Sequence, residues 1–502
     1  MKHSFNLVNE GWIPTLGSEK PYGIRELLKK AHVLGELACD SPLATVGVLR
    51  VLLAVLYRAC GPTDLSEWKS LWSAERFPTE KIDAYLDKHE DKFDLFGEKP
   101  FFQVSKMQIN KWTPFTKLAS ELSTEGQKLL FEWQTTNGLK NASPAMAALR
   151  LIEMQCFGLG GGISADPVVD GETIKRPNFE DGPVARSISI WLTGKYLFHT
   201  LMLNMVPYSE PNKKNDLPCW EQDNIFDRLE LKASGPLDRF TWQSRLILLE
   251  PETNNDQLLV RNMYFAQGRK ADKDWMKSPD PMNIYYVDKK DGISFLRLNE
   301  GKSAWRDIHA LLALDTERTK RNPIFANAAI LVREKILPHD FIYNLNVVGM
   351  VTDQASISIR RHDKMSLPAS LFVDEDLLQF ANVAIQFSEV TASEINTRMR
   401  AVGEFYLPEK MPSRIRSAEL TKFVNSIDSR PCYWSRLENA FTKFILALPR
   451  DDSAALQEWK KTVVSEAEVA LREACEKLGN STRAIRATAQ ISYKFYTEEK
   501  KK

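Results

Sequence analysis

The chain has 502 residues, of which 67 are basic and 66 are acidic, so its formal net charge is +1 at neutral pH. Hydrophobic residues make up 43% of the sequence, enough for a sizeable core, and the length corresponds to about three domains as a first expectation. The balanced charge excludes binding of nucleic acid through bulk positive charge, so any basic surface must be local.

The N-terminal part of the chain predicts buried helices. Residues 1–14 lack the apolar core of a signal peptide, so we expect a cytoplasmic protein. The most apolar stretch, residues 43–57, contains Arg50 and is shorter than the roughly 20 residues that cross a bilayer. We therefore predict helices at 22–37 and 41–60 and no membrane partner.

A glycine run follows the next predicted helix. Residues 144–157 have apolar side chains at helical spacing and begin with proline, and Gly158-Leu159-Gly160-Gly161-Gly162 comes directly after them. A dinucleotide-binding loop instead follows a strand and opens a helix, and its sixth position is glycine, where this chain has Ile163. The run therefore predicts no nucleotide cofactor.

The rest of the chain divides into a strand-rich and a helical part. Residues 185–205 read as an apolar helix, 238–300 as antiparallel strands with a hairpin signal at Asp291-Gly292, and 353–361 as a strand. After Pro368, helical periodicity at 370–406, 417–427, 432–447, 453–478 and 481–497 predicts an antiparallel four-helix bundle. The expected fold class is α+β, with a large mixed N-terminal domain at 1–367 that carries antiparallel strands and the bundle at 368–502.

Signals of catalysis are weak. The sequence has no HExxH, P-loop, GxSxG or protein-kinase motif, the six cysteines form no CxxC pair, and the seven histidines show no metal spacing. We predict no enzyme, no catalytic residue, no metal and no cofactor. Two alternatives stay open: a Mg²⁺-dependent nuclease that uses Asp280, Asp288 and Lys290 on adjacent strands, and a purely structural scaffold.

Three local features together are typical of a DNA-binding protein. Glycines 160–162 can lie against a minor groove about 6 Å wide, and lysines and arginines neutralise phosphate. A glutamine such as Gln354 at a loop tip can enter a base stack. Each feature also has a simpler interpretation: a helix cap, solvated charges at 267–270, and a turn that leads into a strand at 352–364.

A series of segments is spread along nearly the whole chain. They are FNLVNEGWIPT (5–15), LRVLLAVLYRACGP (49–62), FDLFGEKPFFQV (93–104), FGLGGGIS (157–164), LPCWE (217–221), DRFTWQSRLILL (238–249), DQASISIRRHD (353–363) and CYWSRLENAF (432–441). In their order and spacing these segments resemble the CasA family, the large subunit of the type I-E CRISPR surveillance complex Cascade.

The resemblance implies a role in antiviral defence without catalysis. A member of this family recognises the protospacer-adjacent motif (PAM) in double-stranded target DNA, mainly from the minor groove, and wedges the duplex so that the crRNA guide can form an R-loop. Its implied partners are the other Cascade subunits with their crRNA, the target DNA and the helicase-nuclease effector that the complex recruits.

The resemblance also assigns positions. The glycine loop matches Gly160, Gly161 and Gly162, the wedge matches Gln354 and Ala355, and the family's frequent asparagine before the wedge is Asp353 here, whose carboxylate cannot donate to base acceptors. The basic PAM turn matches Arg269 and Lys270. Lys289 and Lys290 match a lysine patch along the duplex, and Phe131, Glu132 and Trp133 match the loop that docks near the crRNA 5′ end. Independently of the resemblance, the basic cluster Arg360 and Arg361 is expected to contact the DNA backbone.

Overall fold

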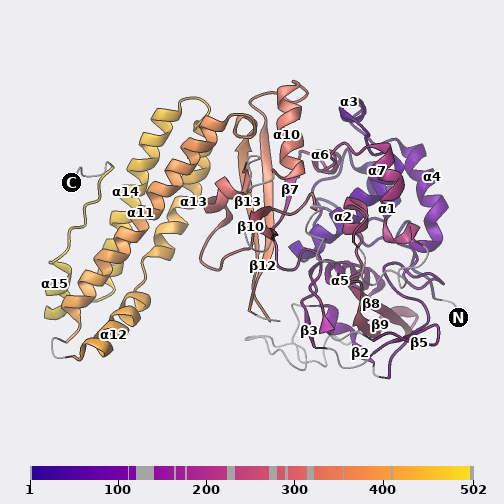
Figure 1. The fold of residues 1–502 in the computed structure, drawn as a ribbon, viewed down its shortest axis with the longest axis horizontal. Coiled ribbons are helices and arrows are strands. Elements are labelled where there is room, and N and C mark those ends of the chain that lie inside the picture. Colours follow the sequence, from indigo (N-terminus) through magenta and orange to yellow (C-terminus); the bar gives the residue numbers. More distant parts are fainter. Residues whose placement is uncertain are drawn as a thin grey trace. The chain divides into compact units, whose positions relative to one another are not determined.

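The computed structural model consists of two compact units, each built from several segments of the chain. Unit 1 contains residues 1–300, 313–328 and 344–364, and unit 2 contains 301–312, 329–343 and 365–502. Figure 1 shows their helices and strands, with labels where there is room. The structure describes residues 3–110, 112–119, 141–162, 166–175, 178–222, 232–270, 280–288, 292–313, 321–353, 356–408 and 411–497.

Helix α2 (Pro42–Ala59) is the central core helix of unit 1. Its N-terminus is capped by the Ser41 hydroxyl, which accepts from the backbone N–H groups of Leu43 and Ala44, and Pro42 occupies the first position, where no N–H is needed. Within the described residues it is the one helix long and apolar enough to cross a membrane, but 83% of its apolar window is buried inside the protein. The prediction of a buried helix is therefore confirmed.

The other helices of unit 1 surround α2. Helix α5 (Pro144–Phe157) confirms the predicted helix before the glycine run, and its Ser143 side chain caps Met146 N–H. Contacts to α2 come from α5, α4, α6 and α8. The bounds of the remaining helices are α1 (Ile24–Lys30), α3 (Leu65–Ser73), α4 (Thr79–His89), α6 (Leu197–Leu203), α7 (Glu210–Asn215) and α8 (Pro236–Phe240).

Wherever the structure gives the register of two paired strands, they run antiparallel. The strands form several small sheets rather than one large one. One long hairpin is β8 (Arg245–Asn254) with β9 (Gln257–Gln267), and β10 (Tyr285–Asp288) with β11 (Gly292–Phe295) is the hairpin predicted from Asp291-Gly292. Strand order in the larger sheets is β2-β9-β8, β13-β12-β7 and β1-β4-β5. The remaining bounds are β1 (Met107–Gln108), β2 (Thr113–Pro114), β3 (Gly161–Gly162), β4 (Val168–Val169), β5 (Glu172–Thr173), β6 (Asn178–Phe179), β7 (Ser189–Thr193), β12 (Ile342–Asp353) and β13 (Ser356–Pro368).

The predicted helix at 185–205 is wrong in its first half. Residues 189–193 form strand β7, which pairs with β12 from Ser189↔Val348 to Thr193↔Asn344, and only Leu197–Leu203 is helical. Every residue of β7 is buried, so the run shows no alternation of polar and apolar side chains. Such a continuous apolar run cannot be told from a buried helix by periodicity, and the distant partner strand decides the outcome.

Unit 2 is mainly helical. Trp459 lies at its core, where its indole N–H donates to the Ala384 carbonyl at 2.9 Å and its ring packs against Phe441 and Trp305. Asp374 and Asp451 cap the two longest helices. The helices of residues 365–502 are α11 (Glu375–Tyr406), α12 (Ser413–Ser426), α13 (Arg430–Ala447), α14 (Asp452–Glu476) and α15 (Thr482–Thr488).

A fully buried ion pair connects α2 to the strand-rich part of unit 1. One terminal nitrogen of Arg50 lies 2.6 Å from the Asp280 carboxylate, and the other donates to the Arg239 carbonyl at 2.6 Å. The Arg50 guanidinium also lies 5.1 Å from the Phe240 ring centroid. Charges this deep in a protein persist only when they are paired, so each partner depends on the other.

Replacing Arg50 with methionine tests this pair. The change leaves the Asp280 carboxylate buried without its counter-ion, and we expect the free energy of unfolding to fall by about 3–5 kcal/mol. Urea denaturation followed by circular dichroism measures it. The double variant Arg50→Met/Asp280→Leu removes both charges and should recover part of the loss, since the Met282 N–H loses its acceptor and the buried Arg239 loses a neighbouring carboxylate. Equal losses in the single and double variants would contradict the assignment.

Candidate nucleic-acid interface

The glycine run contains two kinds of glycine. Gly158 ends helix α5, and a Cβ there would lie 2.8 Å from the Met154 carbonyl oxygen and 2.9 Å from the Arg245 guanidinium, so packing requires glycine. Gly161 and Gly162 form the exposed strand β3, and a Cβ at either position would meet nothing within 4 Å. Neither has a positive φ angle, so the fold does not explain why these two residues are glycine.

The segment 178–182 holds the run in place. Strand β6 within it pairs with β3, with Gly161 opposite Phe179. The Asp181 carboxylate accepts the Gly160 N–H at 2.8 Å, and the Gly182 N–H donates to the Gly158 carbonyl at 2.7 Å. Sequence reasoning missed this segment, although its Asp181-Gly182 pair is typical of a turn.

Arg245, the first residue of β8, contacts both the glycine run and the segment 178–182. It is buried, and its guanidinium donates to the carbonyls of Leu159 at 2.9 Å and Glu180 at 2.8 Å. Burial lowers the pKa of Arg245 to about 10, so the side chain still carries its charge at neutral pH. One cation therefore joins the glycine run to the segment 178–182.

The turn at 267–270 lies against this segment too. The Gln267 side-chain carbonyl accepts the Glu180 N–H at 2.6 Å, and the Lys270 ammonium lies 3.1 Å from the Glu180 carboxylate. About half of the Lys270 side chain is exposed, so it can also contact a ligand. The structure thus brings the glycine run and the turn, two of the predicted features, to the same place.

Arg269 has a different environment from its neighbour. It is 3% exposed, and its guanidinium donates to both carboxylate oxygens of Asp238, at 2.5 and 3.1 Å. It also stacks 3.6 Å from the centroid of the Trp242 ring. The structure therefore departs from the expectation that Arg269 reaches DNA: its charge is committed to a buried ion pair, and Lys270 is the accessible cation of the turn.

Arg186 connects the segment 178–182 to the end of strand β12. Its guanidinium lies 2.6 Å from the Asp181 carboxylate and donates to the Thr352 hydroxyl at 3.0 Å. Thr352 is next to Asp353, the last residue of β12, and β12 and β13 are neighbours in their sheet. The predicted wedge residues Gln354 and Ala355 join these two strands but lie outside the described residues.

The remaining predicted residues are placed as follows. Arg361, on β13, donates to the carbonyls of Asn299 at 3.0 Å and Glu300 at 2.6 Å and stays partly exposed, as does Arg360. Asp353 is the last residue of β12, and its side chain lies outside the described part of the chain. Five further predicted residues lie outside the described residues: Lys289, Lys290, Phe131, Glu132 and Trp133.

One of the three residues of the nuclease alternative cannot bind a metal ion. Asp280 is buried and is the counter-ion of Arg50, so its carboxylate is not available to a metal ion. Asp288 ends strand β10, and Lys290 lies outside the described residues. Among the described residues, no group of three or more histidine, cysteine, aspartate or glutamate side chains could hold a metal ion.

The fold is that of a mixed helix and strand protein with small antiparallel sheets and a mainly helical second unit. The family model for CRISPR-associated protein Cse1 matches residues 6–470. CRISPR-associated protein CasA/Cse1 of Thermus thermophilus is 30% identical, over 98% of this chain and 96% of the relative. The chain belongs to the CasA/Cse1 family, the large subunit of Cascade, as its sequence motifs predicted.

Solved structures have the same fold. The crystal structure of Thermus thermophilus CasA superimposes with a TM-score of 0.82 at 28% identity, and covers 97% of this chain and 98% of its own. Cse1 from Acidimicrobium ferrooxidans gives 0.78 at 23% identity, with 97% and 96% covered. A chain of a CRISPR RNA-guided surveillance complex gives 0.73 at 18% identity, with 97% and 98% covered.

Replacing Arg186 with alanine tests the link between the glycine run and β12. We expect faster amide hydrogen exchange at 158–162 and at the end of β12, because Arg186 bonds to Thr352 and also fixes Asp181, the acceptor of the Gly160 N–H. Stability should fall by only about 1 kcal/mol, since Arg186 and Asp181 are partly exposed. Hydrogen-exchange mass spectrometry and thermal melting measure the two effects.

The matched control is Arg25→Ala, which removes the ion pairs with Asp83 and Asp87 elsewhere in unit 1. It should leave exchange at 158–162 unchanged. If Arg186→Ala also leaves both segments fully protected, Arg186 does not hold them together.

Proposed function

We propose that this chain recognises the PAM of duplex DNA from the minor groove and starts R-loop formation. The observation that carries the proposal is that Gly161 and Gly162 are exposed glycines that the fold does not require, tied through Asp181 and Arg186 to the end of β12. A bare backbone at an exposed position suits a ligand that approaches more closely than side chains allow.

The minor groove fits such a surface. It is only about 6 Å wide and presents a degenerate pattern of hydrogen-bond groups, so backbone contacts discriminate weakly between sequences. We therefore expect the chain to tolerate several PAM sequences. Asp353 strengthens this expectation, because a carboxylate accepts hydrogen bonds only and cannot read the acceptors on the groove floor.

Gln354 and Ala355 would act next to the glycines. They occupy the connection between β12 and β13, and the Arg186 contact to Thr352 brings the end of β12 to the glycine run. Insertion of a side chain between base pairs costs a few kcal/mol per step. Because exchange of a DNA duplex for an RNA–DNA hybrid is nearly balanced, a wedge of this size can decide whether the R-loop starts.

Phosphate contacts would come from local cations, since the net charge of the chain is only +1. We assign Lys270, Arg360, Arg361, Lys289 and Lys290 to this role, with Arg269 as the buried support of the turn. Phe131, Glu132 and Trp133 are proposed to dock the subunit near the crRNA 5′ end.

The remaining parts of the proposal concern the whole subunit. We propose a domain boundary near residue 367 and an antiparallel four-helix bundle after it, for which the packing of α11 against α12, α13 and α14 is the support. The subunit has no activity of its own, acts in the cytoplasm and helps to recruit a helicase-nuclease.

A PAM-library binding screen with the reconstituted complex tests the proposed PAM recognition. A pure scaffold would show no preference among PAM sequences and little dependence of binding on salt.

A bulky residue at Gly161 tests the glycine loop. Gly161→Leu should abolish PAM-dependent binding, because the side chain would occupy the space that the groove needs. The free energy of unfolding should change by less than about 0.5 kcal/mol, since a Cβ at this position meets nothing within 4 Å. Gel-shift titration on PAM-containing and PAM-free duplexes measures the binding.

The control for Gly161→Leu is Gly158→Ala, whose Cβ would lie 2.8 Å from the Met154 carbonyl oxygen and should lower stability instead. Equal DNA binding by Gly161→Leu and the wild type would remove the glycine loop from the interface.

Replacing Gln354 with alanine tests the wedge. Assembly with the other subunits should be intact, whereas R-loop formation should slow by about tenfold, a modest part of the cost of opening a base step. Stopped-flow fluorescence of a base analogue beside the PAM measures the opening rate. Gln257→Ala, at the exposed start of β9, is the control, and an unchanged rate in Gln354→Ala would rule out the wedge.

A further inference from the structure

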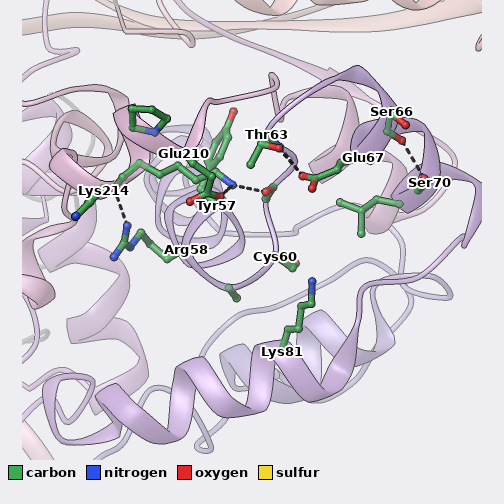
Figure 2. Close-up of a pocket in the computed structure, with 15 residues that line it drawn as sticks. Tyr57, Arg58, Cys60, Thr63, Ser66, Glu67, Ser70, Lys81, Glu210 and Lys214 are labelled. Atoms are coloured by element: carbon green, nitrogen blue, oxygen red, sulfur yellow. Dashed lines mark hydrogen bonds and ion pairs between the residues drawn. The ribbon is translucent and has the colours of Figure 1, made fainter.

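A pocket of about 1020 Å³ opens in unit 1 between the C-terminus of α2 and helices α3, α4 and α7 (Figure 2). None of the residues assigned above to DNA or crRNA lines it. Its volume is far larger than a single ion needs and reaches the upper range of ligand pockets. Its lining residues are Tyr57, Arg58, Ala59, Cys60, Gly61, Thr63, Ser66, Glu67, Ser70, Leu71, Lys81, Glu210, Pro211, Lys213 and Lys214.

The floor of the pocket is preformed. Lys213 is buried and its ammonium donates to the Gly61 carbonyl, which connects α7 to the end of α2. The Arg58 guanidinium makes two hydrogen bonds to the Glu221 carboxylate, at 2.7 and 2.6 Å, and a third to the Lys213 carbonyl at 2.7 Å. A floor with its own polar groups paired keeps its shape without an occupant.

Two of the four cationic side chains that line the pocket have no carboxylate partner among the described residues. Arg58 is neutralised by Glu221, and Lys213 lies 3.5 Å from Glu210. Lys81 of α4 and Lys214 of α7 are exposed and make no ion pair with a described residue. Figure 2 shows that Lys81 extends from α4 toward Cys60. The pocket therefore presents unpaired positive charge from two sides.

The side chains that line the pocket are suited to binding a partner rather than to catalysing a reaction. Burial raises the pKa of the Cys60 thiol to about 12, against the opposing pull of Lys81 and Lys213, so Cys60 is no nucleophile at neutral pH. Hydrogen bonds from the Thr63 N–H and hydroxyl lower the pKa of Glu67, which is therefore ionised and engaged within the chain.

We propose that this pocket is a docking site for an acidic segment of another protein of the Cascade complex. Carboxylates of that segment would pair with Lys81 and Lys214, and its side-chain stems would contact Leu71, Ala59 and Pro211. A nucleic-acid backbone fits less well, because it carries a phosphate at every nucleotide and some of these would face the Glu67 and Glu210 carboxylates on the rim, whereas an acidic segment can place its carboxylates at Lys81 and Lys214 alone. The N-terminus of α3 offers no anion site either, since the Asp64 side chain already caps it.

Charge reversal in the full-length chain tests the proposal. We expect Lys81→Glu/Lys214→Glu to bind the remaining reconstituted complex about tenfold more weakly, which is the size expected when two partly exposed ion pairs become repulsive. Lys69→Glu/Lys88→Glu is the matched control: it makes the same charge change on α3 and α4, at exposed residues outside the pocket, and should bind like the wild type.

Zero-length carbodiimide cross-linking of the wild-type complex identifies the occupant directly. Cross-links from Lys81 or Lys214 to an aspartate or glutamate of a partner subunit would support the proposal. It is overturned if both lysines stay as reactive to acetylation in the complex as in the free chain. It is also overturned if ultraviolet cross-linking joins the pocket to crRNA or DNA, or if the pocket and control variants weaken assembly equally.

Discussion

The hydrogen bond from the Gly160 N–H to the Asp181 carboxylate, with Arg186 on the other carboxylate oxygen, is the contact on which the proposed interface depends. Asp181 belongs to none of the three features that the sequence makes conspicuous. It nevertheless places the glycine run beside the end of β12, because Arg186 also donates to Thr352. A surface made of a loop and the end of a strand needs such a fixed point, since exposed loops otherwise move independently.

Buried and exposed charged side chains have different roles in this protein. Arg50, Arg245 and Arg269 hold segments together from inside the protein, each through carbonyls or a carboxylate at hydrogen-bond distance. Removing one partner of such a pair is costly because the other stays buried and charged. Lys270, Lys81 and Lys214 are exposed and keep much of their contact with water, and they are the cations that we propose to bind DNA or a partner protein.

This division explains where reasoning from the sequence succeeded and failed. Arg269 and Lys270 are adjacent and chemically alike, yet one is committed to Asp238 and Trp242 and the other is half exposed. In the sequence, Asp280 is equally suited to a metal site. In the structure its carboxylate pairs with Arg50, which lies 230 positions earlier in the chain. Sequence pattern identifies which side chains are charged, but only the partners brought in from elsewhere decide which charges are free.

The sequence by itself determined the helices α2 and α5, the hairpin β10–β11, the long helices after Pro368 and the family, because periodicity, capping residues and turn dipeptides act over a few neighbouring positions. The tertiary structure alone decided that 189–193 is a strand paired with β12, that the segment 178–182 supports the glycine run, and that Gly161 and Gly162 have open space around them. The physical reason is the same in each case. These outcomes depend on contacts between residues far apart along the chain, and local preference is too weak to specify them.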